Sequence, residues 1–68
     1  MIKVGDVVYY KNDWKGKRPW YLYSISKNNL CTIVLLRDGK ITNGKNGENR
    51  LNASIVNLNI SEICLQKF

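Results

Sequence analysis

The stretch Val4-Gly5-Asp6-Val7-Val8 and, a short way along the chain, the stretch Gly16-Lys17-Arg18-Pro19-Trp20 decide how this chain is expected to fold. Gly5 and Asp6 interrupt a β-rich segment over residues 2–10, which predicts a bend or a bulge at that point. Pro19 has a fixed φ and no N–H, so it fits the first residue of a strand. Together the two stretches predict a first strand, a polar basic loop over residues 11–18, and a second strand that begins at Pro19.

The second strand alternates in character, which predicts that Trp20, Leu22 and Ser24 share one face of the sheet. Tyr21, Tyr23 and Ile25 then share the other face. The tyrosines, which are Tyr9, Tyr10, Tyr21 and Tyr23, are expected mainly to pack on the sheet, because alternating aromatic side chains are common sheet stabilisers.

Further strands are indicated along the rest of the chain. Residues 30–37 are almost continuously apolar and predict the central strand. Asp38-Gly39 predicts a type I′ hairpin, because glycine tolerates its positive φ. Residues 43–50 predict a second polar loop, residues 51–58 alternate again, and residues 60–65 suit a last strand or a short helical turn that leads into one.

Length and charge limit both the fold and the partners. The chain has 68 residues, which is enough for one domain and one core. Several short strands in such a chain avoid exposed edges by curling into a barrel. We therefore predict a single all-β domain over residues 1–68, a small SH3-like barrel of about five or six short antiparallel strands. The formal net charge of +6 favours a polyanionic partner such as nucleic acid.

Many enzyme classes are excluded by the residues that the chain lacks. It contains no histidine, so it has no histidine general base and no Ser–His or Cys–His nucleophile. Its carboxylates are scattered, and we expect neither a metal nor a cofactor. Cys31 and Cys64 lie in apolar runs and are expected as buried free thiols, with a disulfide as the alternative. The N-terminus is not a signal peptide and no run is long enough to span a bilayer, so we expect a cytoplasmic protein without a membrane partner.

Two loops carry many of the basic side chains. In the loop over residues 11–18, cations surround Trp14, and this combination suits single-stranded nucleic acid because cations hold phosphates while the ring stacks on a base. The alternative is that Trp14 folds back as a lid on the end of the barrel. The loop over residues 43–50 adds further cations. The predicted nucleic-acid-binding residues are Lys11, Trp14, Lys15, Lys17, Arg18, Lys45 and Arg50.

The opening of the chain resembles a known family. Ile2-Lys3-Val4-Gly5-Asp6-Val7-Val8, with Gly16-Lys17-Arg18-Pro19, looks like the opening of PemK/MazF-like toxins, and residues 51–56 and 60–63 are similar to the strands that end that family's barrel. The resemblance implies an SH3-like barrel, a homodimer, an antitoxin partner, and metal-independent cleavage of single-stranded RNA by attack of the 2′-hydroxyl. By matching position, the catalytic residue would be Arg18, whose forked donors can stabilise charge on phosphate oxygens.

The chain also departs from that family. Its members carry a Thr or Ser at the end of the third strand, whereas this strand ends Leu35-Leu36-Arg37-Asp38, and the family's helical segments are absent or shortened. The departures suit a minimal barrel that kept the scaffold and lost the nuclease. Gly5-Asp6-Val7-Val8 followed by Lys15-Gly16-Lys17 is also similar to KOW-type SH3-like modules, which bind RNA or protein and catalyse nothing.

Two hypotheses for the function follow. The first is a small basic RNA-binding barrel of PemK/MazF-like type, with ribonuclease activity left open; Arg18 would hold a phosphate, Lys15 and Lys17 would steer the strand, and Trp14 would stack on a base. The second is a non-catalytic protein-binding module, of the kind that phages and plasmids encode, that inhibits a host nucleic-acid enzyme. An unpaired edge strand would also allow a homodimer.

Overall fold

The computed structural model describes residues 2–13, 16–41 and 54–66. The predicted all-β fold of short antiparallel strands is confirmed, with one 3₁₀ turn as its helical element in the described ranges. The central position predicted for residues 30–37 is also confirmed, because this strand pairs with three others. The elements are β1 (Val7–Tyr10), β2 (Pro19–Ile25), β3 (Leu30–Arg37), β4 (Lys40–Ile41), β5 (Ile55–Asn59), the 3₁₀ turn η1 (Ile60–Glu62) and β6 (Ile63–Cys64).

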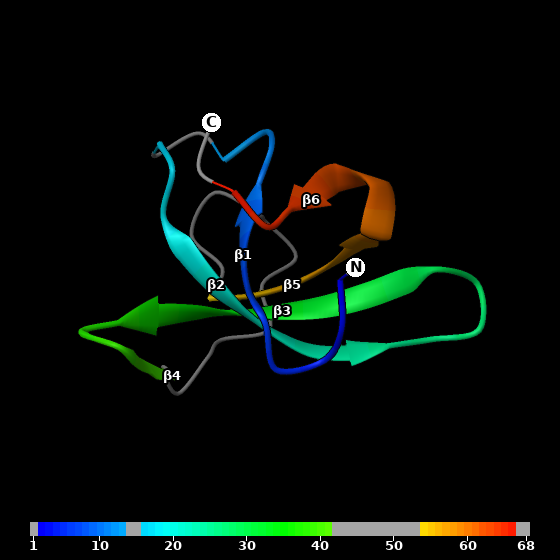
Figure 1. The fold of residues 1–68 in the computed structure, drawn as a ribbon, viewed down its shortest axis with the longest axis horizontal. Helices are drawn as coiled ribbons and strands as arrows, with labels where there is room; N and C mark the ends of the chain where they lie inside the picture. Colours follow the sequence, from blue (N-terminus) through cyan, green and yellow to red (C-terminus); the bar gives the residue numbers. More distant parts are fainter. Residues whose placement is uncertain (1, 14–15, 42–53, 67–68) are drawn as a thin grey trace.

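The six strands form one bent sheet that does not close into a barrel. Their order is β4-β3-β2-β1-β6, and β5 also pairs with β3. Figure 1 shows β1 crossing in front of β3 at a steep angle, with β2 curving between the two directions. β1 and β3 run in the same direction, because both are antiparallel to β2. β5 is antiparallel to β3 and β6 is antiparallel to β1, so β5 and β6 also run in the same direction as each other. Two neighbouring parallel strands need a long crossover connection, whereas only the three residues of η1 join β5 to β6. β5 and β6 therefore do not pair, and the predicted barrel does not close.

A β-bulge in β2 changes which side chains face the core. Leu22 pairs with Ile33 and Ser24 pairs with Thr32, which leaves Tyr23 as the extra residue. Beyond the bulge, Ile25 packs against the core and Ser24 is exposed, so the predicted sharing of faces is wrong for these two residues. A single inserted residue shifts the side-chain period by one, and a simple alternation does not reveal it.

Two predicted turns are confirmed. Asp38 and Gly39 both have positive φ, 52° and 75°, as a type I′ hairpin between β3 and β4 requires. The bend at Gly5 and Asp6 brings the N-terminal segment against β2, where the Gly5 N–H donates to the Leu22 carbonyl over 2.9 Å. The Asp6 carboxylate stabilises this bend by accepting from the Lys3 N–H at 2.8 Å.

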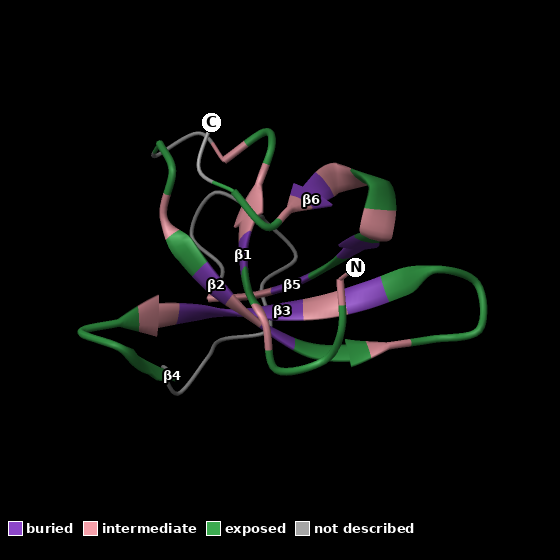
Figure 2. Ribbon diagram, viewed as in Figure 1, coloured by how far each residue is buried: buried purple, intermediate pink, exposed green. Residues whose placement is uncertain are grey.

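The core lies on the inner side of the bent sheet, where the central segments of β1, β2, β3 and β5 are buried (Figure 2). Trp20 is the largest fully buried side chain, and it lies opposite Val8 in the β1–β2 ladder. The buried apolar cluster consists of Val8, Trp20, Leu22, Cys31, Ile33, Leu35, Val56, Leu58 and Ile63. Both cysteines are free thiols as predicted, but only Cys31 is buried, since Cys64 is half-buried on the short strand β6.

Candidate nucleic-acid interface

The polar loop between β1 and β2 is tied to its surroundings by backbone hydrogen bonds. The Lys11 N–H donates to the Glu62 carbonyl at 2.9 Å, which joins the start of the loop to η1. The Asp13 N–H donates to the Tyr10 carbonyl at 3.1 Å, and the Gly16 N–H donates to the Asp13 carbonyl at 3.1 Å. These successive tight turns fix the backbone at Asp13, so the direction of its side chain is set by the loop.

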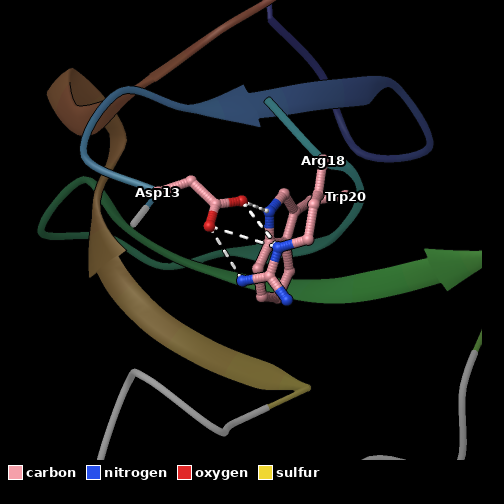
Figure 3. A network of polar contacts seen from close by, with 3 residues as sticks. All are labelled: Asp13, Arg18 and Trp20. Atoms are coloured by element: carbon pink, nitrogen blue, oxygen red, sulfur yellow. Dashed lines mark hydrogen bonds and ion pairs between the residues drawn. The ribbon is translucent and has the colours of Figure 1, made fainter. Parts of the chain in front are cut away.

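The buried Asp13 carboxylate is the centre of a partly buried polar network (Figure 3). Only 1% of this side chain is exposed, and Arg18 donates to it from two nitrogens, with Nη2 at 2.8 Å from Oδ1 and Nε at 3.0 Å from Oδ2. The indole Nε1–H of Trp20 donates to Oδ2 at 3.1 Å. The Arg18 Cζ also lies 5.1 Å from the centroid of the Trp20 ring, within the range of a cation–π contact.

This network gives Arg18 a structural role at the junction of the loop and β2. The junction was predicted, but the carboxylate that binds the guanidinium was not. A signal for it exists in the sequence: a buried tryptophan needs an acceptor for its indole N–H, and Asp13 is the carboxylate of the loop that precedes Trp20. The predicted contact between Arg18 and a phosphate stays a prediction, and it would have to use Nη1 or displace Asp13 from Nε and Nη2.

The other predicted binding residues divide into two groups. Lys11 and Lys17 are exposed near the two ends of the loop, which places both at the same end of the β1–β2 pair. Lys17 also takes part in a polar or electrostatic contact within the protein. The remaining predictions, for Trp14, Lys15, Lys45 and Arg50, lie outside the described residues.

The described carboxylates and the described cations are placed differently. Asp6, Asp13 and Glu62 are half-buried residues whose carboxylates accept hydrogen bonds from Lys3 N–H, from Arg18 and Trp20, and from Asn59 N–H, respectively. Asp38 is at the tip of the β3–β4 hairpin. By contrast, six of the described cationic residues are exposed, and these are Lys3, Lys11, Lys17, Lys27, Arg37 and Lys40. Among the described residues, the excess positive charge therefore lies on exposed side chains.

Comparison with protein-family models, with curated protein sequences and with solved structures gives no significant match to this chain. Within residues 2–13, 16–41 and 54–66, no helix is long and apolar enough to cross a membrane. The same ranges contain no cluster of three His, Cys, Asp or Glu side chains that could hold a metal ion.

Proposed function

We propose that this chain binds single-stranded nucleic acid, principally RNA, on the surface formed by the loop between β1 and β2 and the adjacent strands. The observation that carries the proposal is the separation of charge: three described carboxylates accept bonds from the protein's own donors, while both described lysines of this loop are exposed. Exposed cations neutralise phosphates and release counterions, which is the main source of affinity for nucleic acid. Lys11 and Lys17, at the two ends of the loop, are the proposed phosphate contacts.

We propose binding without cleavage, because Nε and Nη2 of Arg18 already donate to the Asp13 carboxylate. If a phosphate took over Nε and Nη2, the Asp13 carboxylate, 1% exposed, would lose its cation inside the protein. Removing one partner of such a buried pair costs about 3–5 kcal/mol. Arg18 in this proposal shapes the loop, and the PemK/MazF-like ribonuclease becomes the competing outcome of the same test.

The test measures the affinity for a labelled single-stranded oligoribonucleotide by fluorescence anisotropy over a range of salt concentrations. Each phosphate contact contributes about 0.7 to the slope of log K against log salt for a single strand. Lys11→Gln and Lys17→Gln should each weaken binding and lower that slope. Lys27→Gln, in the turn between β2 and β3, and Lys40→Gln, at the start of β4, lie away from this loop (Figure 1) and are matched controls that should leave both the affinity and the slope unchanged.

Two results would contradict the proposal. Binding that is absent, or that does not depend on salt, would remove the phosphate contacts and favour an apolar protein interface instead. Discrete RNA fragments in the presence of a chelator would show a metal-independent ribonuclease. Because Arg18→Ala also removes the partner of a buried carboxylate, Arg18→Lys, which keeps the positive charge, is the variant to compare for cleavage.

A further inference from the structure

The outer face of β1 and β2 carries a row of tyrosines. Val8 and Trp20 are paired in the ladder and both are buried, which identifies the inner face of these strands. Since successive side chains alternate between faces, Tyr9 and Tyr21 point outward. Tyr9 pairs with Pro19, two residues before Tyr21, so the two tyrosines are diagonal neighbours across the strands.

A third tyrosine of this row lies at the bulge in β2. Tyr23 is the inserted residue, and 61% of it is exposed, the largest fraction among the exposed large hydrophobic residues of the described chain. It follows Tyr21 by two residues, which is a separation of roughly 6.6 Å along a strand. Tyr9 and Tyr21 are half-buried, so part of each residue is also accessible. Tyr10 differs from these three, since it packs against the core.

Exposed lysines lie at both ends of this tyrosine row, defined as Tyr9, Tyr21 and Tyr23. At the Tyr9 end, Lys11 follows β1 directly and Lys17 lies two residues before Pro19, the partner of Tyr9. At the Tyr23 end, Lys3 belongs to the bend that hydrogen-bonds to Leu22 through Gly5. The carboxylate nearest in sequence to that end, Asp6, accepts from the Lys3 N–H. The row therefore combines aromatic rings with positive charge at either end.

We propose that the tyrosine row is a stacking platform for the unpaired bases of single-stranded nucleic acid, with the flanking lysines holding the phosphates on either side. This inference rests on the proposed function and deepens it, because it assigns the base contacts to the sheet. Aromatic rings next to a cationic track bind single strands of any sequence, since every base has a π-face. Charge complementarity favours this ligand over a protein, because the apolar row is bounded by cations.

The central experiment compares Tyr23→Ala with Tyr23→Trp in the oligoribonucleotide anisotropy assay. Because Tyr23 is mostly exposed, both variants should keep the melting temperature of the wild type. Tyr23→Ala should weaken binding roughly 5- to 150-fold, the effect of losing one stacked base, without changing the salt slope. Tyr23→Trp should retain the affinity, and its indole fluorescence should be quenched by the bound strand. Ile41→Ala is the matched control, since Ile41 is 51% exposed on the distant strand β4.

The outcomes separate this inference from the proposed function. Unchanged affinity of Tyr23→Ala, together with the normal salt dependence, would overturn the platform and leave the proposed phosphate contacts standing. A loss of affinity in Tyr23→Ala that Tyr23→Trp does not restore would also overturn stacking. No binding by the wild-type chain would overturn both proposals and would favour a protein as the partner that contacts the exposed tyrosines.

Discussion

The buried carboxylate of Asp13 is expected to decide whether this domain folds. Asp13→Ala removes the acceptor of two Arg18 nitrogens and of the Trp20 indole N–H at once. Breaking a buried ion pair by removing one partner costs about 3–5 kcal/mol. The Arg18 side chain is 22% exposed, so water can solvate part of it, and the lower end of that range applies. A core of this size rarely supplies more than about 3–5 kcal/mol, so the variant should keep at most about 2 kcal/mol of stability and be partly unfolded at room temperature.

The magnitude can be measured with graded variants. Asp13→Asn keeps an oxygen acceptor for Trp20 but loses the charge, and it should destabilise the domain by about 1.5–3 kcal/mol, the value of a hydrogen bond to a charged group. Arg18→Lys keeps the charge and loses the forked, two-nitrogen geometry and the stacking on Trp20. Urea unfolding, followed by circular dichroism and by tryptophan fluorescence, gives the free energy of unfolding for each variant.

A double-mutant cycle tests the reasoning itself. If the network acts as one unit, Asp13→Asn and Arg18→Lys, which are mild enough to leave a folded baseline, should destabilise the domain by clearly less together than the sum of the two single effects. An Asp13→Ala variant within about 0.5 kcal/mol of the wild type, the range of an ordinary surface substitution, would refute the structural role of the network.

Further predictions concern three other parts of the fold. Burial, and to a smaller degree the charge of Glu62, raises the pKa of the Cys31 thiol, so native Cys31 should react with a thiol reagent more slowly than half-buried Cys64, and the difference should vanish in denaturant. Because the thiol pKa is higher in the folded than in the unfolded protein, the protonated Cys31 thiol contributes stability that is fully present below the unfolded pKa of about 8.5 and is lost as pH rises through the folded pKa. A Cys31→Ala variant should not show this loss in urea unfolding at alkaline pH. Asn59→Ala removes the side-chain acceptor that caps η1, and the melting temperature should fall by the equivalent of about 1 kcal/mol. Gly39→Ala places a Cβ at φ 75° in the hairpin, and unfolding by urea should show a cost of about 1–2 kcal/mol rather than a gain.

Much of the strand pattern could be predicted from local chemistry. Pro19 begins β2 and Asp38-Gly39 forms the hairpin after β3, because these residues restrict or permit particular φ values wherever they occur. The bulge at Tyr23 could not be predicted in this way. It depends on the partner strand, since the extra residue is defined only by the pairing of Leu22 with Ile33 and of Ser24 with Thr32.

For the candidate interface, too, local chemistry predicted some features and the tertiary arrangement decided others. Composition identified the positive charge and the loop that carries Lys11 and Lys17, and both lysines are exposed. It did not identify the partner of Arg18, because an ion pair between two residues of a loop depends on how the loop closes. The open form of the sheet also depends on tertiary arrangement, since it follows from the relative directions of β5 and β6.

By itself, the sequence determined the strands, their turns and the sign of the surface charge, because these follow from side-chain type and from periodicity over a few residues. Only the tertiary structure decided which of those residues are available to a ligand. It directed the Arg18 guanidinium to Asp13, and beyond the bulge at Tyr23 it turned Ser24 outward and Ile25 toward the core. The physical reason is that burial and pairing are properties of residues brought together by the fold, which no single segment of the chain contains.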